Sequence, residues 1–191
     1  MDKFEQLTQL IKERRSIFPP MLSDEKLSDE VIMELLENAN WAPNHRKTEP
    51  WRFRVFKGEA LQRLSDYLGD YYEKNTPPES FSERKLQKTR KKPLMCSHII
   101  AICMQRDPEE RVPEWEELSA VSCAVQNLWL SVTAKGLGGY WSSPKSILAA
   151  DEFLGLAEGE KCYGLFYLGV PKPDVQLAGQ RGDIKEKVTW Q

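Results

Sequence analysis

Hydrophobic residues follow a helical spacing in five segments of the chain and form short apolar runs in four others. Apolar positions three or four residues apart predict helices within residues 3–13, 31–39, 61–72, 115–132 and 149–156. The apolar runs predict strands at residues 53–55, 99–103, 140–141 and 162–169. With 191 residues, the chain is long enough to bury a sizeable core, and we expect residues 1–191 to form a single domain.

The same pattern predicts how several segments pack. Residues 99–103 are apolar on both faces, as in a central strand. The helix at residues 115–132 is apolar or small on nearly every side, which indicates that a second chain packs on it. Residues 73–93 are rich in Lys, Arg, Glu, Ser and Pro, so we expect a solvent-exposed excursion with one short helix. The tail from Pro171 cannot form a core alone and should lie on another part of the assembly.

Composition excludes several classes of function. Lys and Arg number 27 and Asp and Glu 29, and the net charge of −2 argues against nucleic acid as the main partner. No apolar run is long enough to span a bilayer, and the first residues lack the apolar core of a signal peptide. The four cysteines are scattered without a C-x-x-C pair. We therefore expect reduced thiols, no metal site and a cytoplasmic protein.

A dense group of polar and aromatic side chains lies at residues 41–51, after a predicted helix and before a predicted strand. Pro43 and Pro50 exclude a helix interior, and the segment holds one of the two histidines, His45. A lone histidine is usually a surface residue or a satisfied polar group. No nucleophile elbow accompanies His45, so a hydrogen-bonding or ring-binding role suits it better than general-base catalysis.

Two further clusters have both a structural and a functional interpretation. Arg14-Arg15-Ser16 provides donors suited to phosphate oxygens, but cations at a helix end also complement the helix dipole. Residues 136–139, Gly-Leu-Gly-Gly, suit either a helix stop followed by a turn or close approach of the backbone to a flat ligand. They do not match the Rossmann fingerprint, because the third glycine is missing and a strand follows. Arg181, in the tail, would ordinarily be solvated.

The order of these motifs resembles that of the nitroreductase family of FMN-dependent oxidoreductases, in particular its short NAD(P)H nitroreductase branch. The resemblance rests on Arg14-Arg15-Ser16, Ala42-Pro43, Pro50-Trp51, Gly-Leu-Gly-Gly-Tyr-Trp-Ser-Ser at 136–143 and Tyr-Leu-Gly-Val-Pro at 167–171. It covers nearly the whole chain. It implies an α+β fold of three layers, with a mixed central sheet flanked by helices. It also implies an intertwined homodimer with FMN at the subunit interface.

The resemblance also implies roles for particular residues. Arg14, Arg15 and Ser16 would hold the FMN phosphate and ribityl chain, with Arg181 as a second phosphate ligand. Trp141, Ser142 and Ser143 would line the isoalloxazine, and the loop with Trp41, His45 and Lys47 would approach from the other subunit. Positive charge that stabilises the reduced flavin would come from His45, Arg46 or Lys47. Many family members carry asparagine at Lys47 and glutamine at Glu49, so these positions bear on substrate preference.

The activity implied is hydride transfer from NAD(P)H through flavin N5 to a small nitroaromatic or quinone-like acceptor. The cofactor carries this chemistry, so no protein residue needs to act as an acid or base. Two alternatives stay open at this point. One is a flavin-binding sensor or carrier without efficient turnover, favoured if residues 73–93 close over the flavin. The other is a hydrolase that uses His45. The sequence identifies neither the acceptor nor a residue that selects NADH or NADPH.

Overall fold

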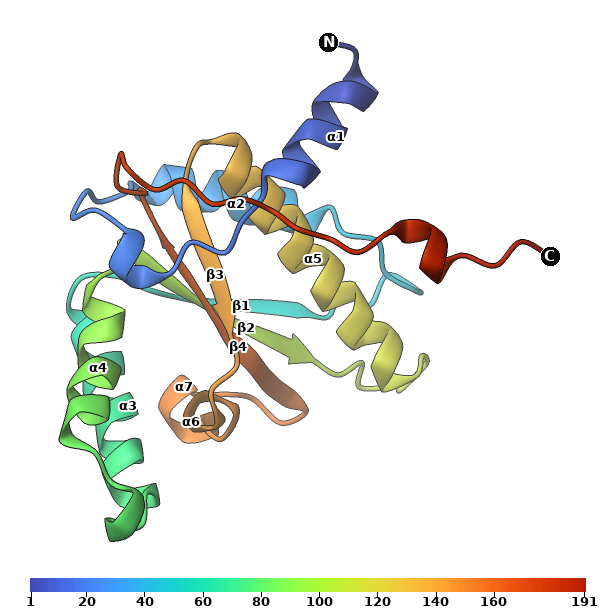
Figure 1. Cartoon of the computed structure of the whole chain (residues 1–191). Coiled ribbons are helices and arrows are strands. Elements are labelled where there is room, and N and C mark those ends of the chain that lie inside the picture. The colour runs from blue at the N-terminus through green and yellow to red at the C-terminus, as the bar shows by residue number, and fades with distance from the viewer.

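A four-stranded sheet forms the middle of the molecule (Figure 1). The computed structural model describes all 191 residues. The strands are β1 (Trp51–Phe56), β2 (His98–Gln105), β3 (Gly138–Ser142) and β4 (Glu160–Gly169), in the order β1-β2-β4-β3. Seven of the eight residues of β2 are buried. This confirms the central strand predicted at residues 99–103.

The sheet differs in one detail from the mixed sheet that the resemblance implied. All three pairs of named strands are antiparallel, and the one parallel pairing is an isolated bridge between Ser16 and Gly139 at the β3 edge. There the amide of Ile17 donates to the carbonyl of Gly139 at 3.0 Å. Pro19 and Pro20 follow and have no amide hydrogen, so this segment cannot extend the parallel ladder.

Helices cover both faces of the sheet, which confirms the three-layer α+β architecture. On one face lie α2 (Asp29–Asn40) and α5 (Glu114–Ala134), and on the other lie α3 (Glu59–Asn75), α6 (Lys145–Leu148) and α7 (Asp151–Leu154). Side chains of β2 alternate between the two cores, with Ile100 and Ile102 on the α5 side and Ile99 and Ala101 on the other. Of the helix predicted at residues 149–156, only the short helix α7 forms, and α6 ends before that range.

The charged segment at residues 73–93 is more ordered than its composition suggested. A twelve-residue helix, α4 (Glu83–Leu94), packs against α3 (Figure 1). Leu86 and Pro93 are buried, and Arg90 forms ion pairs with three carboxylates of α3. Gly69 makes room for the Arg90 side chain, because a Cβ there would lie 2.5 Å from Arg90 Nε. These tertiary contacts stabilise a helix that carries little apolar surface.

Both ends of the chain project from the body (Figure 1). Helix α1 (Lys3–Glu13), as predicted, is amphipathic, but no residue in it is buried. Its Phe4 side chain is 75% exposed, and Trp190 in the tail is 93% exposed. Exposed apolar surface of this kind makes α1 and the tail candidate contact surfaces. No helix combines the length and hydrophobicity needed to cross a bilayer.

Candidate functional site

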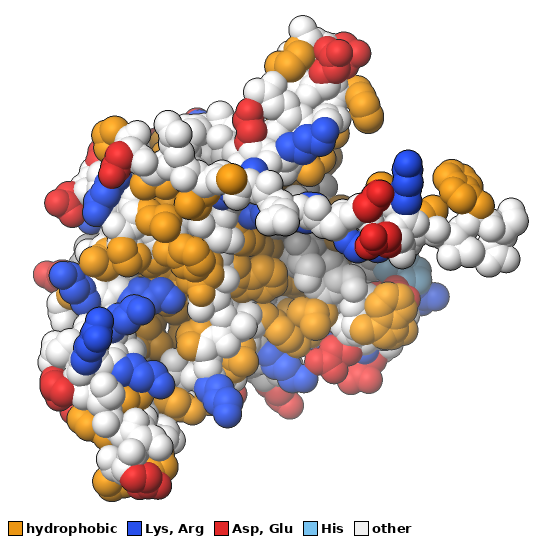
Figure 2. Space-filling view, viewed as in Figure 1, with side chains coloured by type: hydrophobic (Ala, Val, Ile, Leu, Met, Phe, Trp, Pro, Cys, Tyr) orange, Lys and Arg blue, Asp and Glu red, His pale blue; other side chains and the backbone are white.

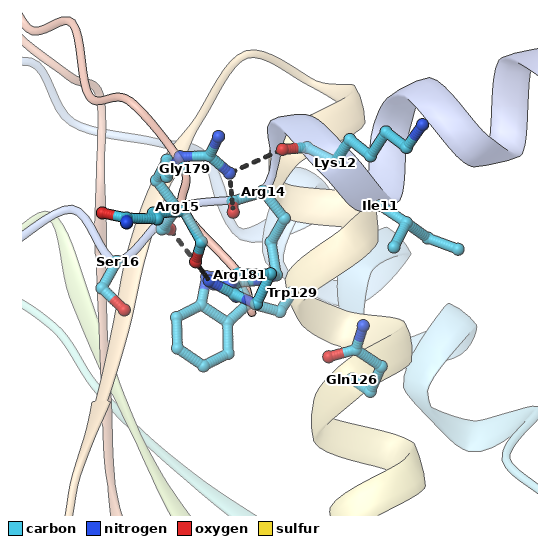
Figure 3. Close-up of a pocket in the computed structure, with 10 residues that line it drawn as sticks. Ile11, Lys12, Arg14, Arg15, Ser16, Gln126, Trp129, Gly179 and Arg181 are labelled. Atoms are coloured by element: carbon cyan, nitrogen blue, oxygen red, sulfur yellow. Dashed lines mark hydrogen bonds between the residues drawn. The ribbon is translucent and has the colours of Figure 1, made fainter. Parts of the chain in front are cut away.

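A cavity of about 710 Å³ lies where the end of α1, the middle of α5 and the tail meet (Figure 3). We call it the arginine pocket. It brings together four residues from opposite ends of the chain for which the resemblance implied one site: Arg14, Arg15, Ser16 and Arg181. Trp129 of α5 and Gly179 of the tail also line it. From the sequence, Trp129 was one apolar position of the helix predicted at residues 115–132.

Arg14 carries a charge without a partner in this pocket. Its guanidinium carbon lies 4.6 Å from the centroid of the Trp129 ring, a cation–π contact. Burial lowers the pKa of Arg14 below its ordinary value, and the neighbouring charges of Arg181 and Arg15 lower it further. None of the salt bridges in the chain involves any of these three arginines. A pocket with clustered cations and no carboxylate favours an anionic ligand.

Arg15 differs from Arg14 because its donors bind the backbone. Its Nε donates to the carbonyl of Leu177 at 3.1 Å, and its Nη1 donates to the carbonyls of Lys12 at 2.6 Å and Arg14 at 2.8 Å. Gly179 lies so close to the guanidinium group that a Cβ there would overlap it. Arg15 therefore fastens the tail to the end of α1, and Lys12, Arg14 and Arg181 are the other cations that line the cavity.

A second cavity of about 340 Å³, which we call the lysine pocket, follows along the same segment of chain. Phe18, Pro19 and Pro20 line it together with Tyr140 of β3 and three lysines of α4. The ammonium of Lys92 lies 4.4 Å from the Tyr167 ring centroid and 4.9 Å from that of Tyr140. Its desolvation lowers the pKa of Lys92, and the nearby Lys88 adds to this effect.

The lysine pocket was not predicted, because the composition of residues 73–93 indicated a solvent-exposed excursion. One signal was available. Leu86 and Pro93 are seven residues apart, the spacing of one helix face, and lysines at 88, 91 and 92 lie between or beside them. Leu86 and Pro93 face the body of the protein, so these lysines are held at its rim. None of the three forms a salt bridge within 4.0 Å.

The loop at residues 41–51 is anchored to α5 and strained. His45 Nδ1 lies 2.6 Å from a carboxylate oxygen of Glu116 in the first turn of α5. Three of the four non-glycine residues with positive φ in the chain are in this loop: Arg46 at 54°, Lys47 at 56° and Glu49 at 41°. Strained backbone of this kind concentrates at functional sites. Trp41, His45 and Lys47 line neither pocket of their own chain.

The three residues predicted to line the isoalloxazine, at positions 141–143, lie at the end of β3 and just beyond it. Because side chains alternate across a strand, Tyr140 faces the lysine pocket while Trp141 packs on the α5 side of the sheet. The indole N–H of Trp141 is buried and has no hydrogen-bond acceptor. Ser142 is half-buried, and Ser143 is exposed. None of these three lines the arginine or lysine pocket, whereas Tyr140, which the sequence analysis did not select, does.

The chain is similar to known proteins over most of its length. The YfhC protein of Bacillus subtilis, named among the NAD(P)H nitroreductases, is 30% identical over 188 residues that cover 96% of this chain and 93% of the relative. A nitroreductase-like family protein from Bacillus cereus superposes with a TM-score of 0.82, at 27% identity, covering 100% of this chain and 98% of that one. A nitroreductase of Desulfovibrio desulfuricans solved with FMN superposes with a TM-score of 0.72, at 24% identity, covering 97% and 96%. The nitroreductase family model matches residues 11–170, so the chain belongs to the nitroreductase family.

Proposed function

We propose that this chain is an FMN-dependent oxidoreductase that takes a hydride from NAD(P)H and passes it to a nitroaromatic or quinone-like acceptor. Residues 1–191 would act as one FMN-binding domain within a homodimer. When bound, FMN supplies a ring nitrogen that accepts and donates the hydride. The observation that carries the proposal is the pair of cationic cavities at residues 14–20, with the arginines and lysines that face them free of carboxylate partners.

The arginine pocket fits the phosphate end of FMN. A phosphate dianion requires fixed cations and hydrogen-bond donors, and Arg14 and Arg181 supply the cations. Trp129 lies under the Arg14 guanidinium group and limits its orientation. Ser16 adds a hydroxyl at the same cavity. Arg15 acts indirectly, because it holds the tail segment that carries Arg181.

The lysine pocket fits a ring that gains negative charge on reduction. Phe18, Tyr140 and the two prolines give it apolar walls, and Lys92 places a partly desolvated ammonium beside them. A positive charge in such surroundings interacts more strongly with a developing anion than one in water. We therefore assign to Lys92 the stabilisation of reduced flavin for which the sequence offered His45, Arg46 or Lys47.

A second copy of the chain would complete the site. The α1 face with Phe4 and Leu7, and the tail with Ile184 and Trp190, leave apolar surface uncovered in one chain. In an intertwined dimer these arms would cover the partner, and the loop with Trp41, His45 and Lys47 would approach the other chain's cofactor. The exposed side chains of this loop and its strained backbone support that placement.

Two other functions receive less support. The one side chain that hydrogen-bonds His45 is a carboxylate, so a hydrolase would lack a nucleophile activated by this histidine. A sensor or carrier would bind FMN without turnover. The location in the cytoplasm remains a prediction, and all four cysteines are free.

Anaerobic stopped-flow mixing tests the proposed function. FMN-loaded protein should lose its flavin absorbance when mixed with NADH or NADPH and recover it when a nitroaromatic compound or a benzoquinone is added. If FMN stays bound but neither dinucleotide bleaches it, the protein is a flavin-binding sensor or carrier. If no FMN binds, the assignment of both pockets is wrong.

A further inference from the structure

Three cations of α4 form a stripe along one side of the helix. Arg84, Lys88 and Lys91 occur at positions i, i+4 and i+7, a spacing that places side chains on one helix face. None of them has a carboxylate within 4.0 Å. All three side chains are exposed, and the stripe therefore presents charge to solvent without internal neutralisation.

Three carboxylates of α3 pair with another cation of α4, Arg90, and not with the stripe. Arg90 binds Asp70 at 2.8 Å and Glu73 at 2.7 Å, and its Nη1 lies 3.5 Å from Asp66. Its side chain packs over Gly69 of α3. The structural cation of the α3–α4 hairpin is thus Arg90, and the three cations of the stripe have no part in joining the two helices.

The stripe also connects two cavities. Lys88 and Lys91 line the lysine pocket and, on their other side, a groove of about 550 Å³ between α3 and α4. Arg84 lines that groove farther along the helix. With a rise of about 1.5 Å per residue, Arg84 lies roughly 12 Å along the helix axis from Lys92. Figure 2 shows basic side chains gathered beside an apolar surface on this side of the molecule.

We propose that the stripe of Arg84, Lys88 and Lys91 binds the phosphate groups of the dinucleotide reductant and makes the protein prefer NADPH to NADH. This inference rests on the proposed function, in which the nicotinamide meets a flavin seated at the lysine pocket. A dinucleotide extending from there along α4 brings its diphosphate to Lys88 and Lys91 and its 2′-phosphate to Arg84. The guanidinium fork of arginine suits a terminal phosphate, which only NADPH carries at that position.

Replacing the two lysines of the stripe and replacing Arg84 should therefore change dinucleotide affinity in different ways. The diphosphate is common to both dinucleotides, so the double variant Lys88→Gln/Lys91→Gln should weaken both. The 2′-phosphate belongs to NADPH alone, so Arg84→Gln should weaken NADPH by about tenfold, the usual effect of losing one charge-assisted contact, and leave NADH unchanged. Arg63→Gln is the matched control, because Arg63 is an exposed cation of the same hairpin that lines neither cavity and forms no salt bridge.

The experiment measures the rate of flavin bleaching against NADPH and NADH concentration in FMN-loaded wild type and the three variants. Inhibition by adenosine 2′,5′-bisphosphate, compared with AMP, tests recognition of the 2′-phosphate separately. The proposal predicts tighter NADPH binding in the wild type, lost in Arg84→Gln and retained in Arg63→Gln. Equal affinity for the two dinucleotides in the wild type, or equal behaviour of Arg84→Gln and Arg63→Gln, would overturn it.

Oxidation of the reduced flavin tests whether the stripe binds an anionic acceptor instead of the dinucleotide. If Lys88→Gln/Lys91→Gln slows oxidation by 4-nitrobenzoate but not by neutral nitrobenzene, with dinucleotide binding unchanged, the stripe selects an acidic acceptor and the dinucleotide assignment is wrong. Failure of the proposed function is recognised separately, since the wild type would then bind no FMN or would be bleached by dithionite but by neither dinucleotide.

Discussion

The guanidinium carbon of Arg14 lies 4.6 Å from the centroid of the Trp129 ring, so a cation from the end of α1 is held over an aromatic residue of α5. This contact keeps a charged group at a cavity that contains no carboxylate to bind it. Arg14→Gln should raise the dissociation constant for FMN roughly ten- to a hundredfold, the cost of one charged hydrogen-bonding partner. Trp129→Leu should cause a smaller increase, since a partly buried cation–π contact contributes roughly 0.5–2 kcal/mol.

Riboflavin provides the control for this prediction, because it has the same ring and no phosphate. Fluorescence titration should give nearly equal riboflavin affinities for the wild type and Arg14→Gln. If Arg14→Gln weakens riboflavin as much as FMN, the arginine pocket does not bind the phosphate.

Lys92 should set the reduction potential of the bound flavin. Replacing it with glutamine removes the positive charge beside the tyrosine rings and should make the potential more negative, by about 30 mV for each tenfold loss of preference for the reduced form. Dye-coupled reduction of the FMN-loaded protein measures this shift. Arg63→Gln should leave the potential unchanged, and an unchanged potential in Lys92→Gln would remove Lys92 from the flavin site.

The strain in the loop at residues 41–51 can be measured without a ligand. Lys47 has a φ of 56°, a conformation that costs a non-glycine residue about 1 kcal/mol. Lys47→Gly and Lys47→Ala both remove the charged side chain, but only glycine relieves the strain. Chemical unfolding of the FMN-free protein should show the glycine variant to be more stable than the alanine variant by about 1 kcal/mol. Equal stabilities would mean that the loop is relaxed.

The exposed apolar face of α1 should be an assembly surface. Phe4→Glu/Leu7→Glu places charges on that face without altering any buried residue of the chain. Light scattering should find the wild type dimeric and this variant shifted toward monomer, with loss of bound FMN. A matched variant, Thr8→Glu/Gln9→Glu, changes neighbouring polar positions of the same helix. A wild type that is monomeric while holding FMN would contradict a site completed by two chains.

Asp107, in the turn before α5, should make the stability of the fold depend on pH in acid. The Arg111 guanidinium group lowers the pKa of Asp107 to about 2, below its ordinary value of 3.8. Because the folded-state pKa is depressed, this carboxylate stabilises the fold above about pH 4, and that contribution is lost as the pH falls from 4 toward 2. Thermal melting of Asp107→Asn between pH 6 and pH 2 should show a weaker pH dependence in that window than the wild type. An identical slope would indicate that other groups cause the acid sensitivity.

The parts of the fold with strong hydrophobic periodicity could be predicted from the sequence. The bounds of α1, the central position of β2 and the length of α5 each follow from many apolar positions that share one regular spacing or form one unbroken run. A short helix within residues 73–93 was expected, but the position and packing of α4 could not be predicted in this way, because they depend on contacts with α3. Arg90 reaches three carboxylates of that helix, and their positions relative to α4 are fixed only by the fold.

Some residues of the candidate site could likewise be predicted from the sequence, and others could not. Arg14 and Arg181 share a cavity, as the order of motifs implied, although periodicity alone gives no relation between the two ends of a chain. Lys92 and Glu116 were missed because their roles depend on what lies opposite them, tyrosine rings in one case and His45 in the other. Tyr140 was passed over for Trp141 because the two are adjacent, and only the register of β3 determines which of them faces the lysine pocket.

The absorption spectrum of the purified protein tests the central claim most directly. The protein is incubated with FMN, separated from free FMN by gel filtration, and examined before and after anaerobic addition of NADPH. We predict a flavin spectrum that coelutes with the protein and bleaches on addition of NADPH, and a much weaker one for Arg14→Gln. A colourless protein, or equal retention of FMN by the wild type and Arg14→Gln, would contradict the account.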